Sequence, residues 1–479
     1  MEKASVRGRD PNTEKSHEIL GGNSGQQTVM EAKFTIITFC HGFGLGWFSV
    51  ILAKLQSPIE TELDFVITLN EGSWIGGLSS LGGATGNIVY GILADLIGRK
   101  ASIYVLAIPY IISWILVYLA KSVEFLYVSR FLAGVTGGGT YVIIPIFIGE
   151  IAEPKIRGRL TSLFSLTLNS GIFLGYIITA RVPYHYIPIL GVALPLIYML
   201  LEIYFPETPM FLLQRGLDAR AKESLKFYRN FQSTTKESLQ EFEVEFDKLK
   251  SAVSSSKNSM SNVTWRDFCN KEAFIAFGNG FVLMLLNTFC GAYAILYYTS
   301  SVFVQARTEL HPDINTIIVG LVQVTGVYTA TILVDRFGRR PLLIFSCAAT
   351  SVGMGIFGLY GYLLQNTTVV VSVFSSWLPL VNVCFIMFVA NSGLIPIPFV
   401  LLVELMPSKI RAKASAICLI IFNIIGFVLM KMFPISLAAF GLSAPMWLFA
   451  VTCILGLVYI TFFIRETKGM SLNKVEPEA

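Results

Sequence analysis

Long apolar runs dominate the chain. Runs of about 20 mainly apolar residues, the length an α-helix needs to cross the hydrocarbon of a bilayer, recur along the sequence. Most are apolar on every side, as expected for helices that face lipid and other helices. A polar stretch separates two sets of six, so we predict an all-α membrane protein with twelve transmembrane helices in two bundles. The predicted spans are 34–53, 73–94, 102–120, 126–149, 160–180, 186–204, 273–298, 314–334, 342–364, 377–402, 414–434 and 444–464.

The polar segments divide the chain into five parts. The first part is polar and rich in Gly and Ser and lacks the apolar centre of a signal peptide, which predicts a disordered tail. Two six-helix bundles follow, joined by a linker, and a short tail ends the chain. The predicted parts are the N-terminal tail 1–32, the first bundle 33–204, the linker 205–271, the second bundle 272–464 and the C-terminal tail 465–479.

The linker carries an amphipathic pattern. Leu239, Phe242, Phe246 and Leu249 recur at helical spacing, with charged residues between them. An apolar stripe at this spacing is typical of a helix that packs one face and exposes the other to water. We therefore expect short amphipathic helices beneath the membrane-spanning bundles.

Composition and charge agree with a membrane protein and give its orientation. With 54% hydrophobic and 14% charged residues and a mean hydropathy of +0.64, the chain is too apolar for a soluble domain. Lys and Arg gather in alternate loops, and basic loops stay on the cytoplasmic side. Both termini and the linker are therefore expected to be cytoplasmic. This bias accounts for the net charge of +5, so we expect the lipid bilayer and no nucleic acid as a partner.

A small charged motif occurs twice, 240 residues apart. "DLIGRK" at 95–100 and "DRFGRR" at 335–340 each lie between the second and third spans of their own half. A second element follows the fourth span of each half: a Glu and an Arg seven residues apart. Elements that recur in the same order indicate an internally duplicated six-helix unit, as in transporters built from repeats. The residues of the two sets are Asp95, Arg99, Glu150 and Arg157, and Asp335, Arg339, Glu404 and Arg411.

These clusters have two interpretations. Ion pairs at the membrane edge are partly dehydrated, and removing one partner of a buried pair costs about 3–5 kcal/mol. That is comparable with the roughly 5.5 kcal/mol that carries a two-state equilibrium from one side to the other. Such pairs can therefore set which conformation is favoured. In the alternative interpretation, the cations only fix the topology of the spans.

Six ordered motifs resemble those of sugar porters in the major facilitator superfamily. They are "DLIGRK", "DRFGRRP", "RFLAGVTGGGTYVIIPIFIGEIAEPKIRGRL", "PETPMFLL", "IPIPFVLLVELMPSKIRA" and "RETKGMSL". Within that family, "EGSWIGGLSSLG", "VTWRDF" and "KMFPISL" are similar to stretches of the insect facilitated trehalose transporters and their divergent relatives. The resemblance implies the major facilitator fold and a sugar carrier of the plasma membrane, active as a monomer, without a cofactor. It also implies that the charge clusters close the cytoplasmic side, with Glu207 and Glu466 as further partners.

The expected substrate-binding positions differ from the family pattern. In hexose porters the fifth helix carries a glutamine where this chain has Ser165, and the seventh helix carries two glutamines and an asparagine where this chain has Asn287, Thr288 and Tyr293. A pocket that reads hydroxyl groups needs convergent polar side chains, so these changes predict weak glucose transport and favour another polyhydroxyl compound, with trehalose first. The candidate substrate-binding residues are Ser165, Asn169, Asn287, Thr288, Tyr293, Asn391, Phe399 and Asn423.

Other function classes stay open or are disfavoured. The sequence shows no nucleophile constellation, phosphate loop or metal-ligand set among its four histidines, which disfavours an enzyme and a metal site. A non-transporting sugar sensor or scaffold, and a carrier of a polyol or other polar metabolite, remain alternatives. Proton-driven sugar porters usually carry a carboxylate in the first helix, and the first span here has none, so the resemblance implies transport without a proton, although His41 and Lys431 are ionisable within spans. The orientation predicts glycosylation at Asn366.

Overall fold

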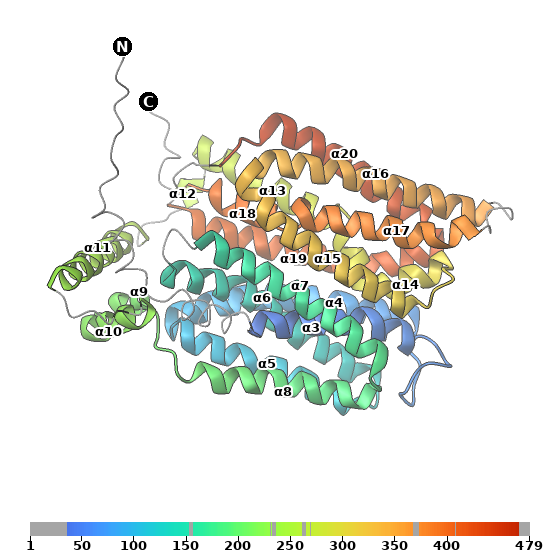
Figure 1. The fold of residues 1–479 in the computed structure, drawn as a ribbon, viewed down its shortest axis with the longest axis horizontal. Helices are drawn as coiled ribbons and strands as arrows, with labels where there is room; N and C mark the ends of the chain where they lie inside the picture. Colours follow the sequence, from blue (N-terminus) through green and yellow to red (C-terminus); the bar gives the residue numbers. More distant parts are fainter. Residues whose placement is uncertain are drawn as a thin grey trace, which may run out of the picture.

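The structure is a computed structural model of the 479-residue chain. It describes residues 36–152, 157–229, 231, 236–260, 265–268, 270–366, 373–407 and 409–468. The predicted N-terminal tail, and all but the first residues of the C-terminal tail, lie outside the described residues. Within them the fold is a bundle of long helices with a smaller group of helices at one end (Figure 1).

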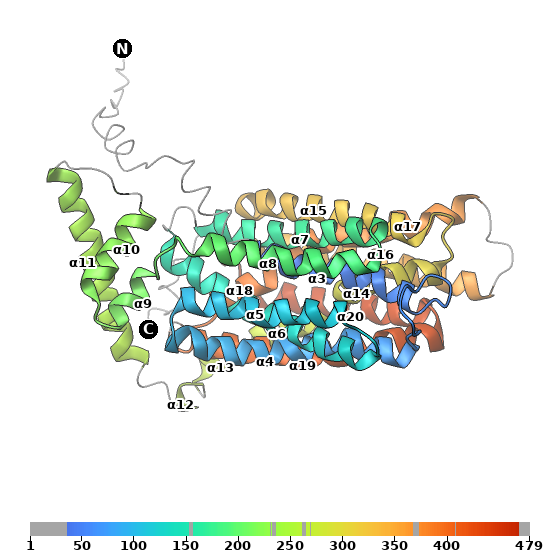
Figure 2. The ribbon, with the colours of Figure 1, turned by 90° about the horizontal axis from the view of Figure 1, so that it is seen from below.

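The first half is made of long helices that begin and end close to the predicted spans. Eleven helical segments among the described residues are long and apolar enough to cross a membrane. The second helix of the bundle, α4, is not among them because Gly, Ser and Asn lower its hydropathy, yet it runs through the same bundle (Figure 2). The helices are α3 (Ile36–Leu55), α4 (Leu69–Leu96), α5 (Arg99–Tyr118), α6 (Val123–Ile151), α7 (Arg157–Arg181), η1 (Tyr184–Tyr186) and α8 (Ile187–Glu202).

The second half departs from the prediction at two spans. The predicted span 273–298 breaks at Gly291, whose φ of +81° is a left-handed conformation that glycine adopts readily. The predicted span 377–402 contains a π-helical turn and three prolines, Pro379 within α17 and Pro396 and Pro398 around the start of α18. The helices are α13 (Lys271–Phe289), α14 (Ala292–Ala306), α15 (Pro312–Phe337), α16 (Arg339–Asn366), α17 (Val373–Val389), η2 (Ala390–Leu394), α18 (Ile397–Glu404), α19 (Arg411–Phe440) and α20 (Ser443–Phe463).

The linker forms the helices at one end, which we call the linker end; the opposite end of the bundle is the far end. Phe242 and Phe246 are buried against residues of neighbouring linker helices, with Leu249 packed beside them. The amphipathic pattern is thus confirmed for these three positions, whereas Leu239 is 38% exposed. The linker helices are α9 (Pro209–Gln214), α10 (Asp218–Tyr228), α11 (Lys236–Met260) and α12 (Trp265–Phe268).

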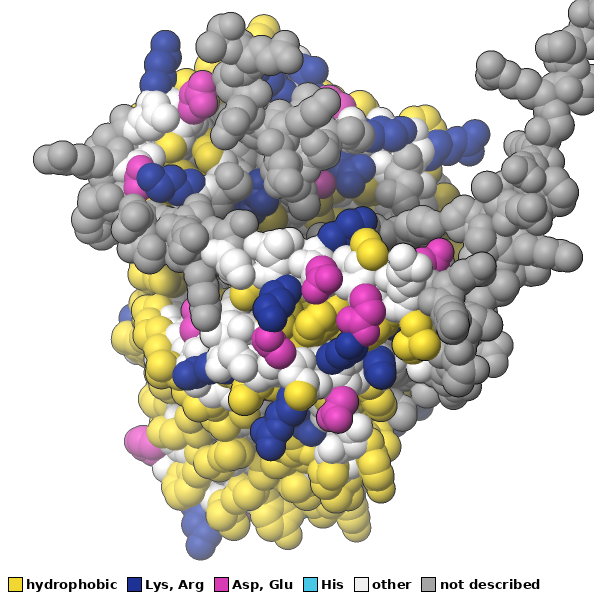
Figure 3. All heavy atoms as spheres, turned by 90° about the vertical axis from the view of Figure 1, so that its left-hand side faces the viewer, with side chains coloured by type: hydrophobic (Ala, Val, Ile, Leu, Met, Phe, Trp, Pro, Cys, Tyr) yellow, Lys and Arg dark blue, Asp and Glu magenta, His cyan; other side chains and the backbone are white. Residues whose placement is uncertain are grey.

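The hydrophobic core is shared by both halves toward the far end and divided at the linker end. One large cluster includes buried residues of both halves, such as Trp47 and Phe303. Two smaller clusters, one around Phe147 and one around Met406, each contain residues of one half and of the linker beside it. Figure 3 shows charged side chains of both signs on the linker end and hydrophobic side chains along the flank below them. The two halves are therefore joined at the far end more than at the linker end.

Candidate functional site

The first charge network connects three elements at the linker end of the first half. The Arg99 side chain donates through Nε to Glu150 Oε1 at 2.8 Å and is 6% exposed. Its Nη1 lies 3.6 Å from Asp95 Oδ1 and donates to the Ala94 carbonyl. The carboxylate of Glu207 accepts from the backbone N–H of Arg99 at 3.1 Å and thereby caps α5. This network fixes the start of α5 against the end of α6 and the start of the linker.

The second network repeats this arrangement in the second half. Arg339 Nη2 lies 3.4 Å from Glu404 Oε1, and Glu466 Oε1 accepts from the Arg339 backbone N–H at 3.0 Å. Thr467 donates to Glu404 as Thr208 donates to Glu150 in the first half. The dipeptide Glu-Thr is therefore a third duplicated element, and it occurs in both the "PETPMFLL" and "RETKGMSL" motifs.

The glycine of each motif allows its glutamate to approach the helix start. Gly98 has a φ of +98° and Gly338 a φ of +94°, conformations that side-chain-bearing residues rarely adopt. A Cβ atom on Gly98 would lie 2.2 Å from Glu207 Oε2, and one on Gly338 would lie 2.9 Å from Glu466 Oε2. Both glycines are thus required by backbone conformation and by contact with the capping carboxylate.

Every pair described above lies within one half and its adjoining tail or linker. The side chains of Arg157 and Asp335 lie outside the described residues. Arg411 Nε donates to the Met406 carbonyl at 3.1 Å, also within the second half. In this conformation Arg99 and Arg339 therefore brace their own halves, and the predicted closure of one half against the other remains a prediction.

A central cavity of about 80 Å³ lies between the halves. A cavity of this size admits a few water molecules but is well below the several hundred Å³ typical of small-molecule binding pockets. Tyr141 of α6 and Phe399 of α18 stack at 5.9 Å across the cavity, and Phe422 packs edge-on against Phe399. The Tyr141–Phe399 stack therefore joins the two halves across the cavity.

Four of the eight candidate substrate-binding residues line this cavity. Thr288, Tyr293, Phe399 and Asn423 belong to the second half, and they face Ser79, Ser80, Asn87 and His41 of the first half. Ser165, Asn169, Asn287 and Asn391 are not among the residues that line it. Their role in binding stays a prediction.

Asn287 has a structural partner instead. Its Nδ2 donates to the carbonyls of Leu394 and Ile395 at 2.9 and 3.0 Å. Pro398 has no N–H to pair with the Leu394 carbonyl four residues earlier. The break in the predicted span 377–402 therefore leaves carbonyl oxygens without a helical partner, and Asn287 donates to them. This is the compensation that a broken helix within a bilayer requires.

The two ionisable residues within the spans also have defined surroundings. The His41 ring lines the central cavity, lies against Gly137 and packs edge-on to Tyr141 at 6.3 Å. Lys431 Nζ of α19 lies 3.3 Å from the centroid of the Trp74 ring of α4, a cation–π contact between the halves.

Sequence reasoning does not identify two polar residues of the first half. Arg130, 2% exposed, lies over the Phe48 ring at 4.2 Å, one turn before a glycine that lines the cavity. Asn87 lines the cavity itself. The signal for Asn87 is its spacing, because Ser79, Gly83 and Asn87 fall four residues apart on one face of α4.

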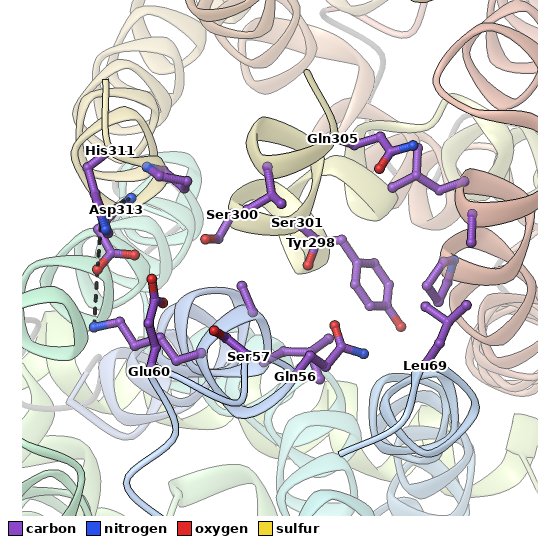
Figure 4. A pocket seen from close by; sticks show the side chains of 18 residues that line it. Gln56, Ser57, Glu60, Leu69, Tyr298, Ser300, Ser301, Gln305, His311 and Asp313 are labelled. Atoms are coloured by element: carbon purple, nitrogen blue, oxygen red, sulfur yellow. Dashed lines mark hydrogen bonds and ion pairs between the residues drawn. The ribbon is translucent and has the colours of Figure 1, made fainter. Parts of the chain in front are cut away.

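A second cavity of about 360 Å³ opens at the far end, between α3, α14, α15 and α19. Figure 4 shows Gln56, Ser57 and Glu60 of the first half facing Ser300 and His311 of the second half across it. At its edge Lys54 Nζ lies 3.1 Å from Asp313 Oδ2. Lys54 also donates to the Thr179 carbonyl at 3.0 Å, so one lysine connects α3, α7 and α15.

The comparisons with known proteins place the chain in a family. The model of the family described as sugar (and other) transporter matches residues 34–479. The chain belongs to this transporter family. It is 31% identical over 439 residues to the facilitated trehalose transporter Tret1 of Polypedilum vanderplanki, covering 91% of this chain and 84% of that protein. It is 30% identical over 455 residues to the Tret1-2 homolog of Drosophila sechellia, covering 94% and 90%.

The solved structures of the family confirm the fold. The xylose transporter XylE from E. coli, in a partially occluded inward open conformation, superposes with a TM-score of 0.74 at 20% identity, covering 94% of this chain and all of that one. The major facilitator fold is therefore confirmed. Membership of a transporter family likewise confirms that the chain is a carrier and not an enzyme.

Proposed function

We propose that this chain carries a sugar across the plasma membrane by alternating access, with trehalose as the first candidate, and works as a monomer. The central cavity is the observation that carries the proposal. It lies between the two halves, and hydroxyl, amide and aromatic groups from both halves line it. Sugars are bound by such groups, because hydroxyls need donors and acceptors and sugar rings need flat apolar faces. The relatives named as facilitated trehalose transporters support this substrate class.

The linker end is cytoplasmic in this proposal, and so are both termini. The charge networks, with Arg99, Lys100, Arg339 and Arg340, lie at that end, and basic residues accumulate on the cytoplasmic side of membrane proteins. The far end, with its larger cavity, is extracellular.

The conformation is closed toward the outside. At the far end, Ser49 Oγ of α3 accepts from the Thr299 backbone N–H of α14 at 3.2 Å, and Lys54 pairs with Asp313. At the linker end the halves keep separate cores. Parting the halves there, with separation of Tyr141 from Phe399, would release the substrate into the cytoplasm.

Transport runs down the gradient without a proton. The sequence of α3 has no Asp or Glu, so the first span supplies no carboxylate that could take up a proton. His41 is the titratable group of that helix that lines the cavity. Acidification-dependent accumulation, abolished by a protonophore, would contradict this part of the proposal.

Tyr293→Ala tests the cavity as the substrate site. The ring packs against Phe422 at 5.8 Å, where it can stack on a sugar, and its hydroxyl can bond one. Uptake of trehalose, glucose, xylose and polyols is measured in proteoliposomes. We expect the variant to lose uptake of the substrate while Tyr362→Ala, on an exposed face of α16, retains it. Unchanged uptake by Tyr293→Ala would place recognition elsewhere.

A further inference from the structure

Asn87 is a buried amide with unused hydrogen-bonding capacity. Its side chain is 4% exposed and lines the central cavity. Neither Oδ1 nor Nδ2 has a hydrogen-bond partner among the described residues. A buried polar group without a partner costs free energy, so such a group in a native structure points to a partner that the protein alone does not supply.

Other asparagines in the spans show how the amide nitrogen is satisfied without a ligand, although Asn169 Oδ1, like both polar atoms of Asn87, is buried without a partner among the described residues. Asn169, Asn391 and Asn423 each donate through Nδ2 to the carbonyl four residues earlier in their own helix, at 2.8–3.0 Å. The corresponding carbonyl for Asn87 belongs to Gly83. That oxygen faces α6, where a Cβ atom added to Gly138 would lie 2.1 Å from it. The Gly83 carbonyl oxygen thus lies at the close contact of α4 with α6, and Asn87 does not donate to it.

The position of Asn87 places it opposite the second half. Asn423 Oδ1 of α19 would lie 2.4 Å from a Cβ atom on Gly83, one helical turn from Asn87 on the same face of α4. Asn423 also lines the cavity, so amides from both halves converge on it. A ligand that bonds both would hold the halves together.

We propose that Asn87 is a specificity-determining residue that binds two neighbouring hydroxyls of a neutral polyhydroxyl substrate. An amide offers one acceptor and two donors, and a diol presents the matching pair: one hydroxyl donates to Oδ1 while its neighbour accepts from Nδ2. An amide without a counter-charge suits a neutral ligand. This inference rests on the proposed function and adds a contact from the second helix of the first half.

The experiment measures uptake of trehalose and its monodeoxy analogues in proteoliposomes by wild type, Asn87→Ala and Asn87→Ser. Loss of a pair of neutral hydrogen bonds predicts a roughly tenfold higher KM for trehalose in Asn87→Ala. Each of the two deoxy analogues that lack one bonded hydroxyl should be weakened in wild type. Its KM should then rise only about threefold on going from wild type to Asn87→Ala, because one of the two bonds is already absent. Asn87→Ser retains a hydroxyl and should lie between the two.

Melting temperature separates binding from a structural role. Because the amide is unpaired in the protein alone, its removal should leave the melting temperature of the ligand-free carrier unchanged or raised. The control is Asn382→Ala, whose Nδ2 donates to the Gly353 carbonyl at 3.0 Å away from the cavity; it should lower the melting temperature and leave the trehalose KM within about twofold.

An unchanged trehalose KM in both Asn87 variants, or equal losses for every deoxy analogue in wild type and variant, would overturn the assignment of Asn87 alone. Absence of uptake of any sugar by the folded wild type would instead overturn the proposed function, and this inference with it.

Discussion

Neutralising either partner of the Lys54–Asp313 pair should open the carrier toward the outside. The pair joins α3 of the first half to α15 of the second at the far end (Figure 4). Opening that end separates the two charges. We expect Lys54→Met and Asp313→Asn each to shift the population toward the outward-open conformation.

The magnitude follows from the geometry. At 3.1 Å the attraction between unit charges is about 5 kcal/mol at an effective dielectric constant of about 20, before the cost of dehydration. The side chains are 22% and 11% exposed, which places the pair between exposed pairs, worth about 0–1 kcal/mol, and buried pairs, whose disruption costs about 3–5 kcal/mol. We expect about 2 kcal/mol, or roughly a 30-fold shift in population.

The assay is labelling of Ser300→Cys by a membrane-impermeant maleimide added outside. Ser300 lines the far-end cavity but is only 1% exposed, so its labelling rate reports opening. Each single variant should label roughly 30-fold faster than the Ser300→Cys parent. The double variant should return toward the parent rate, because removing both charges leaves neither unpaired.

Lys121→Met is the matched control, since this exposed lysine follows α5 at the same end; its labelling rate should equal that of the parent. Parent-like labelling in both Lys54→Met and Asp313→Asn would refute the reasoning.

Three further predictions concern the charge networks and the topology. Arg99→Ala and Arg339→Ala should reach the surface but exchange substrate several-fold more slowly, because each variant loses the ion pair with Glu150 or Glu404. Exchange at the wild-type rate in both variants would mean that these arginines only fix the topology of the spans. Burial would raise the pKa of Glu466, but backbone N–H groups of Lys468, Arg339, Arg340 and Thr467 outweigh it and hold the pKa below its usual range. The stabilisation is therefore present above the unfolded pKa of about 4.5 and is lost as pH falls through the lower folded pKa. Glu466→Gln should have a lower melting temperature than wild type at pH 7, and the difference should narrow below pH about 4.5. A difference in melting temperature that does not depend on pH would contradict this. Glycosidase treatment should shift the mobility of wild type and Asn262→Gln but not of Asn366→Gln; the reverse pattern would invert the topology.

The sequence predicts the fold well because its signals are local. The length of each apolar run defines a span. The repeated motifs "DLIGRK" and "DRFGRR" place Arg99 and Arg339 at equivalent helix starts. The breaks within the spans 273–298 and 377–402 are less evident from the sequence. Gly291 lies in an apolar run like many glycines that only ease helix packing, and neither its left-handed backbone nor the Phe449 ring that leaves no room for a Cβ atom there is visible in the sequence.

The candidate site could be predicted only in part. Tyr293, expected there from its position in the family pattern, and Asn423, expected there as an available polar residue, both line the cavity. Asn287 is turned toward the proline-broken segment instead, a partner that depends on how two distant helices pack. The role proposed for Asn87 cannot be found from the family pattern, because it rests on a buried amide without a partner among the described residues and on an opposing amide on α19.

Uptake of trehalose by the purified wild-type protein in proteoliposomes, with no pH gradient, tests the central claim most directly. The account predicts that labelled trehalose equilibrates to its external concentration, that a protonophore changes neither rate nor extent, and that glucose enters much more slowly. Absence of uptake of trehalose and of every other sugar and polyol, by protein that is folded and monodisperse, would contradict the account.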